Sequence, residues 1–252
     1  MIERHDHPDG IVELRMARPP VNALDPTLLA ALDEAIAAAV AGNAAGLVLS
    51  GGPGVFSAGL DVPHLLTLDR AALEQAWRRF FAVCSALARS PLPIVAALTG
   101  HAPAGGAVLG LFCDYRVMAA GEYRIGLNEV QVGLVPPDCI QHALRRTVGP
   151  YRAERLMVSG TMIESAEAAR IGMVDELAAA DAVVARSVDW LRALLALPRS
   201  AMLATRALAR ADLVAAIDDP QRLRLDVFLD AWFGAETQQV LAAVVARLKS
   251  KG

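Results

Sequence analysis

The sequence predicts an α/β fold that continues into a helical C-terminal region. Short apolar runs with the length of buried strands alternate with amphipathic helical patterns over the first half of the chain, and helical patterns fill most of the second half. The 252 residues are enough to bury a sizeable core without disulfides or metal ions. We therefore expect a core domain over residues 1–195 and a helical region over residues 196–252.

The first elements are two strands with a helix between them. Residues 10–16 alternate apolar and charged side chains, which is the period of a half-buried strand, and we expect an antiparallel strand at a sheet edge. Pro26 opens a helical run that reaches Val40, and proline is favourable at an early helical position. The apolar run 46–50 is typical of a buried strand, because the glycine-rich GGPG ends it.

The elements that follow continue this alternation. Residues 71–89 place large apolar side chains mostly on one helical face, and the apolar run 93–98 predicts another buried strand. Shorter strands and turns are expected at 115–120, 123–126 and 131–135, and the pattern becomes helical from Leu144 onward. The last four helices are expected at 181–197, 200–217, 221–233 and 236–248.

Charge and cysteine content narrow the class of protein. The formal net charge is −3, without a run of five or six like charges, so the sequence predicts no binding of nucleic acid or of an anionic membrane. The three cysteines form neither a CxxC pair nor a zinc-finger pattern, and we expect buried thiols, a reducing compartment and no metal site. The charged start, MIERHDHPDG, is unlike a signal peptide, and these features together predict a cytoplasmic protein.

One long uncharged segment raises the alternative of a membrane span. Residues 90–113 carry no formal charge, and the mean hydropathy of the chain is high, at +0.39. Prolines and glycines interrupt this segment, however, and would be costly in a lipid-facing helix. We therefore expect a buried strand, a glycine loop and a buried helix here.

Two loops rich in glycine and small residues follow buried strands, at 55–62 and 100–110. Ligands of α/β proteins commonly bind at such strand ends, and small residues let a ligand approach backbone N–H groups. Side by side, the two loops would direct two N–H donors at one oxygen, which is what an oxyanion hole requires. A structural turn is the simpler interpretation of either loop alone.

Other chemistries that such loops support fit this spacing poorly. The first loop has the initial glycine spacing of a phosphate-binding P-loop but lacks its Lys and its Ser or Thr. Ser57 in VFSAG is similar to a nucleophile elbow, and His101 and Asp114 would complete a catalytic triad. The elbow lacks its first glycine, which helps to supply the strained turn, so the triad is the weaker alternative.

Three motifs lie in order along the chain: FSAGLDV, then GHAPAGGAVLGLFCDYRVMA, then YRIGLNEVQVGLVPP. Together they resemble the crotonase family, also called the enoyl-CoA hydratase/isomerase family, and the resemblance covers nearly the whole chain. It implies a spiral of ββα units, a C-terminal helical region that builds trimers or dimers of trimers, and an acyl-CoA thioester as substrate. CoA is part of that substrate, so no separate cofactor is implied.

The resemblance also assigns site residues, position by position. Ala58 and Gly105 would supply the two N–H donors to the thioester oxygen, and Gly106, at the start of the next helix, would add a favourable dipole. The other positions that would contact CoA are Arg18, Pro20, Val21, Gly59, Leu60 and Asp61. A turn-forming role is the simpler alternative for these residues.

The choice of reaction depends on the acidic residues. Hydratases of this family use two glutamates, whereas this chain has Val108 at the first position and Glu129 at the second. One carboxyl group can move a proton from C2 to C4 of a 3-enoyl-CoA, but hydration normally divides its work between two groups. The lone glutamate is similar to that of the Δ3,Δ2-enoyl-CoA isomerases, and apolar neighbours such as Val108 and Leu127 would raise its pKa.

The sequence therefore predicts an isomerase that converts 3-enoyl-CoA to trans-2-enoyl-CoA in fatty-acid β-oxidation, with Glu129 as base and acid. Two alternatives stay open: a hydratase that works with Glu129 alone, and a non-catalytic acyl-CoA-binding subunit that kept the fold. A carboxylate that caps a surface turn is the simpler interpretation of Glu129 taken by itself.

Two groups near the C-terminus have open roles. Phe228, Trp232 and Phe233 recur at helical spacing, and we expect them in core or subunit packing, with contact to the acyl chain or CoA as the alternative. Lys249 and Lys251 either approach a CoA phosphate or form a solvated end.

Overall fold

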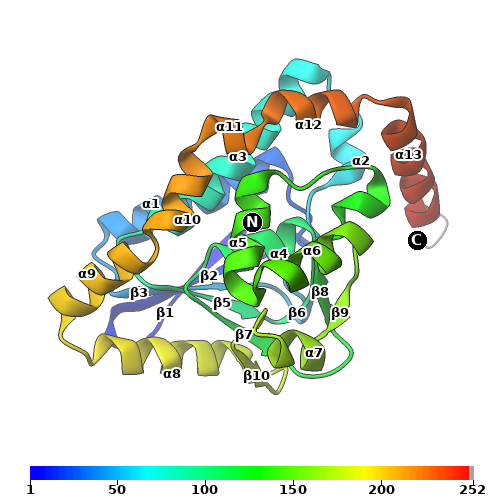
Figure 1. Ribbon diagram of the computed structural model, residues 1–252. Helices are drawn as coiled ribbons and strands as arrows, with labels where there is room; N and C mark the ends of the chain where they lie inside the picture. Colours follow the sequence, from blue (N-terminus) through cyan, green and yellow to red (C-terminus); the bar gives the residue numbers. More distant parts are fainter. Residues whose placement is uncertain (250–252) are drawn as a thin grey trace.

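The structure, a computed structural model, describes residues 1–249 and contains two sheets (Figure 1). The larger sheet has the strand order β1-β2-β3-β5-β7-β10 and the smaller one the order β4-β6-β8-β9. Their bounds are Ile2–Asp6 (β1), Ile11–Met16 (β2), Gly46–Ser50 (β3), Gly54–Val55 (β4), Ile94–Leu98 (β5), Gly100–Pro103 (β6), Tyr115–Ala119 (β7), Arg124–Gly126 (β8), Ile163–Glu164 (β9) and Glu176–Ala178 (β10).

The helices surround these sheets. Those before the C-terminal region are α1 (Pro26–Ala41), α2 (Val62–Leu65), α3 (Arg70–Arg89), α4 (Gly105–Leu111), α5 (Asp138–Val148), α6 (Pro150–Ser159), α7 (Ser165–Arg170) and α8 (Val183–Leu195). The C-terminal ones are α9 (Arg199–Ala209), α10 (Ala211–Asp218), α11 (Pro220–Leu223), α12 (Leu225–Trp232) and α13 (Ala235–Lys249). Short 3-10 helices lie at η1 (Pro8–Gly10) and η2 (Glu129–Val132).

A repeated ββα unit generates this arrangement. A strand of the large sheet is followed by a short strand of the small sheet and then by a helix, as in β3-β4-α2 and β5-β6-α4. Successive units stack in parallel, with β3 beside β5 and β4 beside β6. Loops that follow equivalent strands therefore lie next to each other, which brings the two glycine loops together.

The large sheet is buried on both faces. On one face, α8 packs against Val48, Val95 and Val117, and Trp190 of α8 stacks on Tyr115 with ring centroids 4.4 Å apart. Figure 1 shows α8 along this face and α1, α3, α4 and α10 on the opposite side. Every residue of β3 and β5 is buried, as expected from their continuous apolar runs.

The expected edge strand is wrong in its position. Residues 11–16 do pair antiparallel, but with β1, a strand that the sequence pattern did not reveal, and on their other side they pair with β3. Glu13, expected to face solvent, is buried, where its carboxylate accepts a hydrogen bond from Ser50 Oγ at 2.5 Å and contacts His7 Nε2 at 3.2 Å. The carboxylate thus has partners that are remote in the sequence.

Helix boundaries differ from expectation where the chain bends. The expected helix 200–217 divides at Arg210, whose guanidinium donates hydrogen bonds to the carbonyls of Phe112 and Cys113. The expected helix 221–233 divides at Arg224, which has a positive φ of 41°. Residues 131–135, expected as strand or turn, begin instead within η2. The second half also contains β9 and β10, and its helices begin already at Asp138.

The uncharged segment 90–113 forms the expected buried strand, β5, and buried helix, α4, but the glycine loop between them begins with the short strand β6. Within residues 1–249, no helix combines the length and the apolar character needed to cross a membrane.

The C-terminal helices share one core with the rest of the chain. α10 and α12 contact α3, and Leu213, Phe228 and Trp232 belong to the main buried cluster. The predicted boundary between 195 and 196 falls at the end of α8, and the division into two domains stays a prediction. α13 follows α12, which it contacts, and lies next to α2 (Figure 1).

Candidate active site

A cavity of about 730 Å³ opens between the glycine loops, η2 and the C-terminal helices. Eight of the ten residues predicted for the site line it: Arg18, Pro20, Val21, Ala58, Leu60, Asp61, Gly105 and Glu129. Gly59 and Gly106 lie behind this surface, where they let the two loops approach each other. The structure thus gathers predicted residues from four separate segments at one cavity.

The contact between the two loops requires glycine. A Cβ on Gly59 would lie 3.1 Å from Gly105 N, and the positive φ of Gly59, 80°, also disfavours a side chain. A Cβ on Gly106 would lie 2.6 Å from the carbonyl oxygen of Ser57, closer than atoms can approach. The loops are therefore packed backbone against backbone, as the oxyanion-hole prediction requires.

The two expected N–H donors differ in their bonding. Gly105 begins α4, so its N–H belongs to the first helical turn, which has no acceptor within the helix. It follows Ala104, whose φ of 43° is strained for a residue with a side chain. The Ala58 N–H donates to the carbonyl oxygen of Val21 at 2.9 Å. Of the two predicted donors, only the Gly105 N–H is thus available to a ligand in this structure.

Among the described residues that line the cavity, Glu129 is the one carboxyl group that is not in an ion pair. It opens η2, a turn closed by a hydrogen bond from Leu134 N to its carbonyl oxygen at 3.0 Å. Its Oε2 atom is buried and has no hydrogen-bond partner within residues 1–249. Burial raises the pKa of Glu129 from 4.5 to about 7, in the direction that the apolar surround predicts. The simpler interpretation of Glu129, a surface carboxylate that caps a turn, therefore does not hold.

The other charges of the cavity neutralise each other. The Arg18 guanidinium lies 2.8 Å from an Asp61 carboxylate oxygen and 3.1 Å from Asp25, and it also donates to the carbonyl of Ala23. Arg18 and Asp61 line the cavity next to Pro20. Their ion pair fixes two loops that are far apart in the sequence, and contact of these residues with CoA stays a prediction.

The remaining wall is apolar and aromatic. Val108 lines the cavity together with Glu129, so a residue that cannot ionise stands where the first glutamate was sought. Trp77 and Phe80 of α3 face Phe228 and Trp232 of α12, with the Trp77 and Phe228 ring centroids 4.0 Å apart. Phe228 and Trp232 are thus both core and cavity residues, whereas Phe233 is 41% exposed.

Several cavity residues escaped sequence reasoning: Phe80, Asn128, Val132, Leu134, Pro137, Ile140 and Val244. Most are apolar side chains of ordinary helical or loop patterns, and nothing in such a pattern distinguishes a cavity wall from a core. Asn128 was detectable, because a polar residue beside the predicted base is a candidate for the site. Its Oδ1 atom is buried without a partner in the described part of the chain.

The alternative triad does not assemble. Ser57 Oγ donates to the carbonyl oxygen of Asn22 at 2.7 Å, and His101 Nδ1 accepts from the backbone N–H of Arg124. Asp114 pairs with Arg206 at 2.7 Å. Each of the three side chains thus has a different partner.

The cysteines are buried as predicted, whereas the predicted role of the C-terminal lysines stays a prediction. The cysteines are free and buried, and burial raises the pKa of Cys113 and of Cys139 to about 12. Among residues 1–249, no three His, Cys, Asp or Glu side chains are grouped to hold a metal ion. Lys251 lies outside the described residues, and the role of Lys249 stays a prediction.

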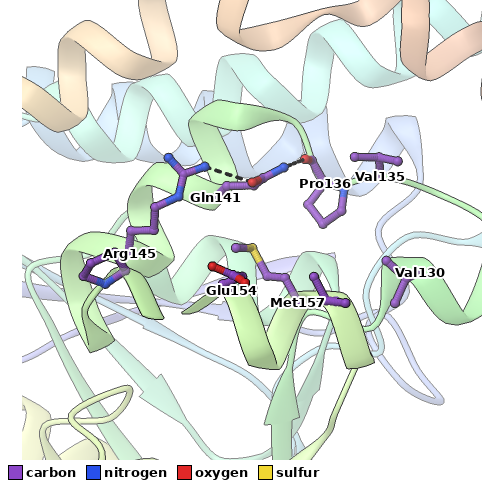
Figure 2. Close-up of a pocket in the computed structure, with 9 residues that line it drawn as sticks. Val130, Val135, Pro136, Gln141, Arg145, Glu154 and Met157 are labelled. Atoms are coloured by element: carbon purple, nitrogen blue, oxygen red, sulfur yellow. Dashed lines mark hydrogen bonds between the residues drawn. The ribbon is translucent and has the colours of Figure 1, made fainter. Parts of the chain in front are cut away.

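A second cavity, of about 320 Å³, lies on the other side of η2. Val130 and Val135 line it, together with Met157 of α6 (Figure 2). Along its rim, Arg145 donates to Gln141 at 2.9 Å and Gln141 donates to the carbonyl of Pro136 at 2.8 Å (Figure 2). The side chains of Arg145 and Gln141 and the Pro136 carbonyl are thus hydrogen-bonded to one another, and none of the residues predicted for the site lines this cavity.

Fold and site together define a class of protein: a crotonase-fold enzyme with a glutamate beside two glycine loops. The family model for enoyl-CoA hydratase/isomerase matches residues 6–245. The chain belongs to the enoyl-CoA hydratase/isomerase family and has the crotonase fold that its motifs predict.

Relatives within the family carry two kinds of name. The chain is 36% identical to a probable enoyl-CoA hydratase, echA17, of Mycolicibacterium paratuberculosis, over 87% of each chain. It is 33% identical to the mitochondrial enoyl-CoA delta isomerase 1 of Homo sapiens, over 80% of this chain and 68% of that protein. The crystal structure of human mitochondrial delta3-delta2-enoyl-CoA isomerase superposes with a TM-score of 0.93 at 29% identity, covering 99% and 98% of the two chains.

Proposed function

We propose that this enzyme isomerises 3-enoyl-CoA to trans-2-enoyl-CoA, and that it serves fatty-acid β-oxidation. The observation that carries the proposal is the lone unpaired carboxyl of Glu129, whose Oε2 atom is buried, with Val108 in the same cavity. A carboxyl group with a pKa of about 7 is suited both to accept and to return a proton near neutral pH. The structural likeness to the human isomerase supports the same choice.

In the first step, the Glu129 carboxylate removes a proton from C2 of the substrate. The electrons of the C2–H bond form a C1–C2 double bond, and negative charge moves to the thioester oxygen. In the second step, the carbonyl reforms, a C2–C3 double bond appears, and C4 takes the proton back from Glu129. Atoms and charge balance over the two steps, and no other reactant is needed.

The N–H groups of Gly105 and Ala58 would stabilise the dienolate oxygen. Each such donor contributes about 2.7–4 kcal/mol in the transition state. The Ala58 N–H must be shared with, or released from, the Val21 carbonyl when the thioester binds. Hydrogen bonds of catalytic groups often reach their final geometry only with substrate present.

A comparison of two substrates tests the proposal. Purified protein is incubated with 3-hexenoyl-CoA, where conjugation near the thioester raises ultraviolet absorbance, and with crotonyl-CoA, where hydration lowers it. We expect conversion of 3-hexenoyl-CoA and little hydration. Efficient hydration without isomerisation would refute the isomerase and favour the second candidate, a hydratase. That candidate is supported by the 36% identity to the probable enoyl-CoA hydratase.

We also propose that copies of the chain assemble as trimers. A cyclic trimer joins two different faces of each copy, and large apolar side chains are exposed on two segments. Val158 and Tyr151 of α6 are 75% and 70% exposed beside the second cavity, and Leu208 of α9, a helix that buries none of its residues, is 80% exposed. Contiguous exposed apolar patches are typical of interaction surfaces, and the proposed trimer would cover these side chains.

Light scattering of two variants tests this assembly. Val158→Glu or Leu208→Glu alone should give monomers, because each interface needs both faces. Mixing the two variants should restore one intact interface per pair and give dimers. A trimeric mass for either variant would contradict the proposed interface.

A further inference from the structure

The last helix, α13, closes one side of the active-site cavity. It contacts α2, η2 and α12, and Figure 1 shows it beside α2 at the end of the C-terminal region. Residues of α2 and of η2 both line the cavity, so α13 connects two of its walls. A helix in this place influences both the access of water and the position of the η2 loop.

One stripe of α13 faces inward. Thr237, Leu241 and Val244 follow the spacing of one helical face, and Thr237 and Leu241 are 4% and 0% exposed. Val244 lines the cavity itself. Within this stripe, Thr237 is the polar member, and a polar residue is buried at little cost only when it is hydrogen-bonded.

The Thr237 hydroxyl is bonded to the loop that carries Glu129. Its Oγ1 donates to the carbonyl oxygen of Gly133 at 2.9 Å. Gly133 ends η2 in the left-handed conformation, with φ of 75°, and a Cβ there would lie 2.7 Å from Thr237 Oγ1. Gly133 therefore serves both the turn and the close approach of α13.

This contact lies a few bonds from the base. Gly133 N donates to the carbonyl of Val130, and Leu134 N donates to the carbonyl of Glu129, so the turn is one hydrogen-bonded unit. On its outer side, Gln131 Nε2 anchors the same turn to the carbonyl of Gly160. The carboxyl group itself has no partner at Oε2 among the described residues, so its place depends on how the turn is held.

We propose that Thr237 is a positioning residue for Glu129: its bond to Gly133 holds the η2 turn against α13 and keeps the carboxyl group against the apolar wall of the cavity. The inference rests on the proposed function for its catalytic readout. The charged residues that line the cavity besides Glu129, namely Arg18 and Asp61, pair with each other, which leaves burial as the main influence on this carboxyl group.

Substitution of Thr237 tests the role. Thr237→Val keeps the shape and loses the hydroxyl, Thr237→Ser keeps the hydroxyl, and Thr237→Ala replaces the valine variant if that does not fold. Thr147→Val is the matched control, because Thr147 Oγ1 also donates to a backbone carbonyl, that of Ala143, within α5.

We expect Thr237→Val to lower kcat about tenfold with a smaller change in KM. The acid limb of its pH profile should also move from near pH 7 toward lower pH, because water that reaches the carboxyl group lowers its pKa. Thr237→Ser should restore both, and Thr147→Val should match the unmodified enzyme. An unchanged pH profile and kcat per folded molecule in Thr237→Val would overturn the positioning role.

A second readout does not depend on catalysis. The pH dependence of unfolding is compared for the unmodified protein and Glu129→Gln, each measured with and without the additional substitution Thr237→Val. The pH-dependent difference caused by Glu129 should shrink when the threonine is replaced by valine; equal differences would also overturn the role. If 3-enoyl-CoA is not isomerised but this coupling is found, the proposed function fails while the positioning role stands.

Discussion

The glycine-loop side and the Glu129 side of the cavity are built by different means. On the first side, Gly59 and Gly105 are held by backbone contacts between neighbouring ββα units, and little freedom is left. On the second side, η2 is held by contacts with segments far away in the sequence: Thr237 of α13 donates to the carbonyl of Gly133, and Gln131 of η2 donates to the carbonyl of Gly160. The proposed N–H donors therefore depend on the sheet architecture, whereas the proposed acid-base group depends on helix packing.

This difference separates two requirements of enolate chemistry. Stabilising a charge needs fixed dipoles that do not reorganise, and a loop packed backbone against backbone supplies them. Moving a proton needs a group whose pKa is adjusted, and a burial-dependent carboxyl such as Glu129 supplies that. Substitutions on the two sides of the cavity should therefore affect kcat and its pH dependence differently.

The largest effect is expected at Glu129. Glu129→Gln removes the proton acceptor and should lower kcat by roughly 10²–10⁴-fold, the range of general acid-base catalysis. Binding of a saturated acyl-CoA, measured by calorimetry, should change little, because the amide occupies the same space. A variant that keeps most of its turnover would remove Glu129 from the mechanism.

The same substitution should change how stability depends on pH. The folded pKa of about 7 lies above the ordinary value of 4.5, so the folded state holds a proton that the unfolded state has lost between these two values. The contribution of Glu129 to stability thus falls as pH rises from about 4.5 to 7 and then stays constant. Over this pH range, the free energy of unfolding of Glu129→Gln should rise by about 3 kcal/mol relative to that of the unmodified protein.

Denaturant unfolding at pH 5 and at pH 8 measures this gain. We expect the advantage of the glutamine variant to be larger at pH 8. A difference between the variant and the unmodified protein that is equal at both values would contradict a buried, protonated Glu129.

The smallest effect is expected on the loop side. Gly106→Ala places a Cβ 2.6 Å from the Ser57 carbonyl and should cost about 1–3 kcal/mol of stability, the range for overpacking. Separation of the loops should also lower kcat without moving the pH profile. Gly110→Ala, in the same helix, is the control, because its Cβ would meet no atom closer than 3.6 Å. Equal behaviour of the two variants would argue against tight contact between the loops.

Much of the fold was predictable because local patterns and neighbouring units produce it. The apolar runs of β3 and β5 and the amphipathic pattern of α3 identified elements, and the parallel stacking of ββα units then brings the glycine loops together. The sequence predictions failed where a contact between distant residues determines the structure. Glu13, for example, is buried because its carboxylate contacts Ser50 and His7. The bend at Arg210 likewise follows contacts with carbonyls of another segment.

The sequence by itself determined which groups could do the chemistry: two small-residue loops, one glutamate, and a valine at the other acidic position. Residue type and local conformation suffice for these, because glycine and a carboxyl group carry their properties with them. Only the tertiary structure decided that Ala58 N–H is engaged by Val21, that Arg18 pairs with Asp61, and that Thr237 anchors the turn of Glu129. Those contacts join segments far apart in the chain, and burial, which raises the pKa of Glu129, exists only once they have formed.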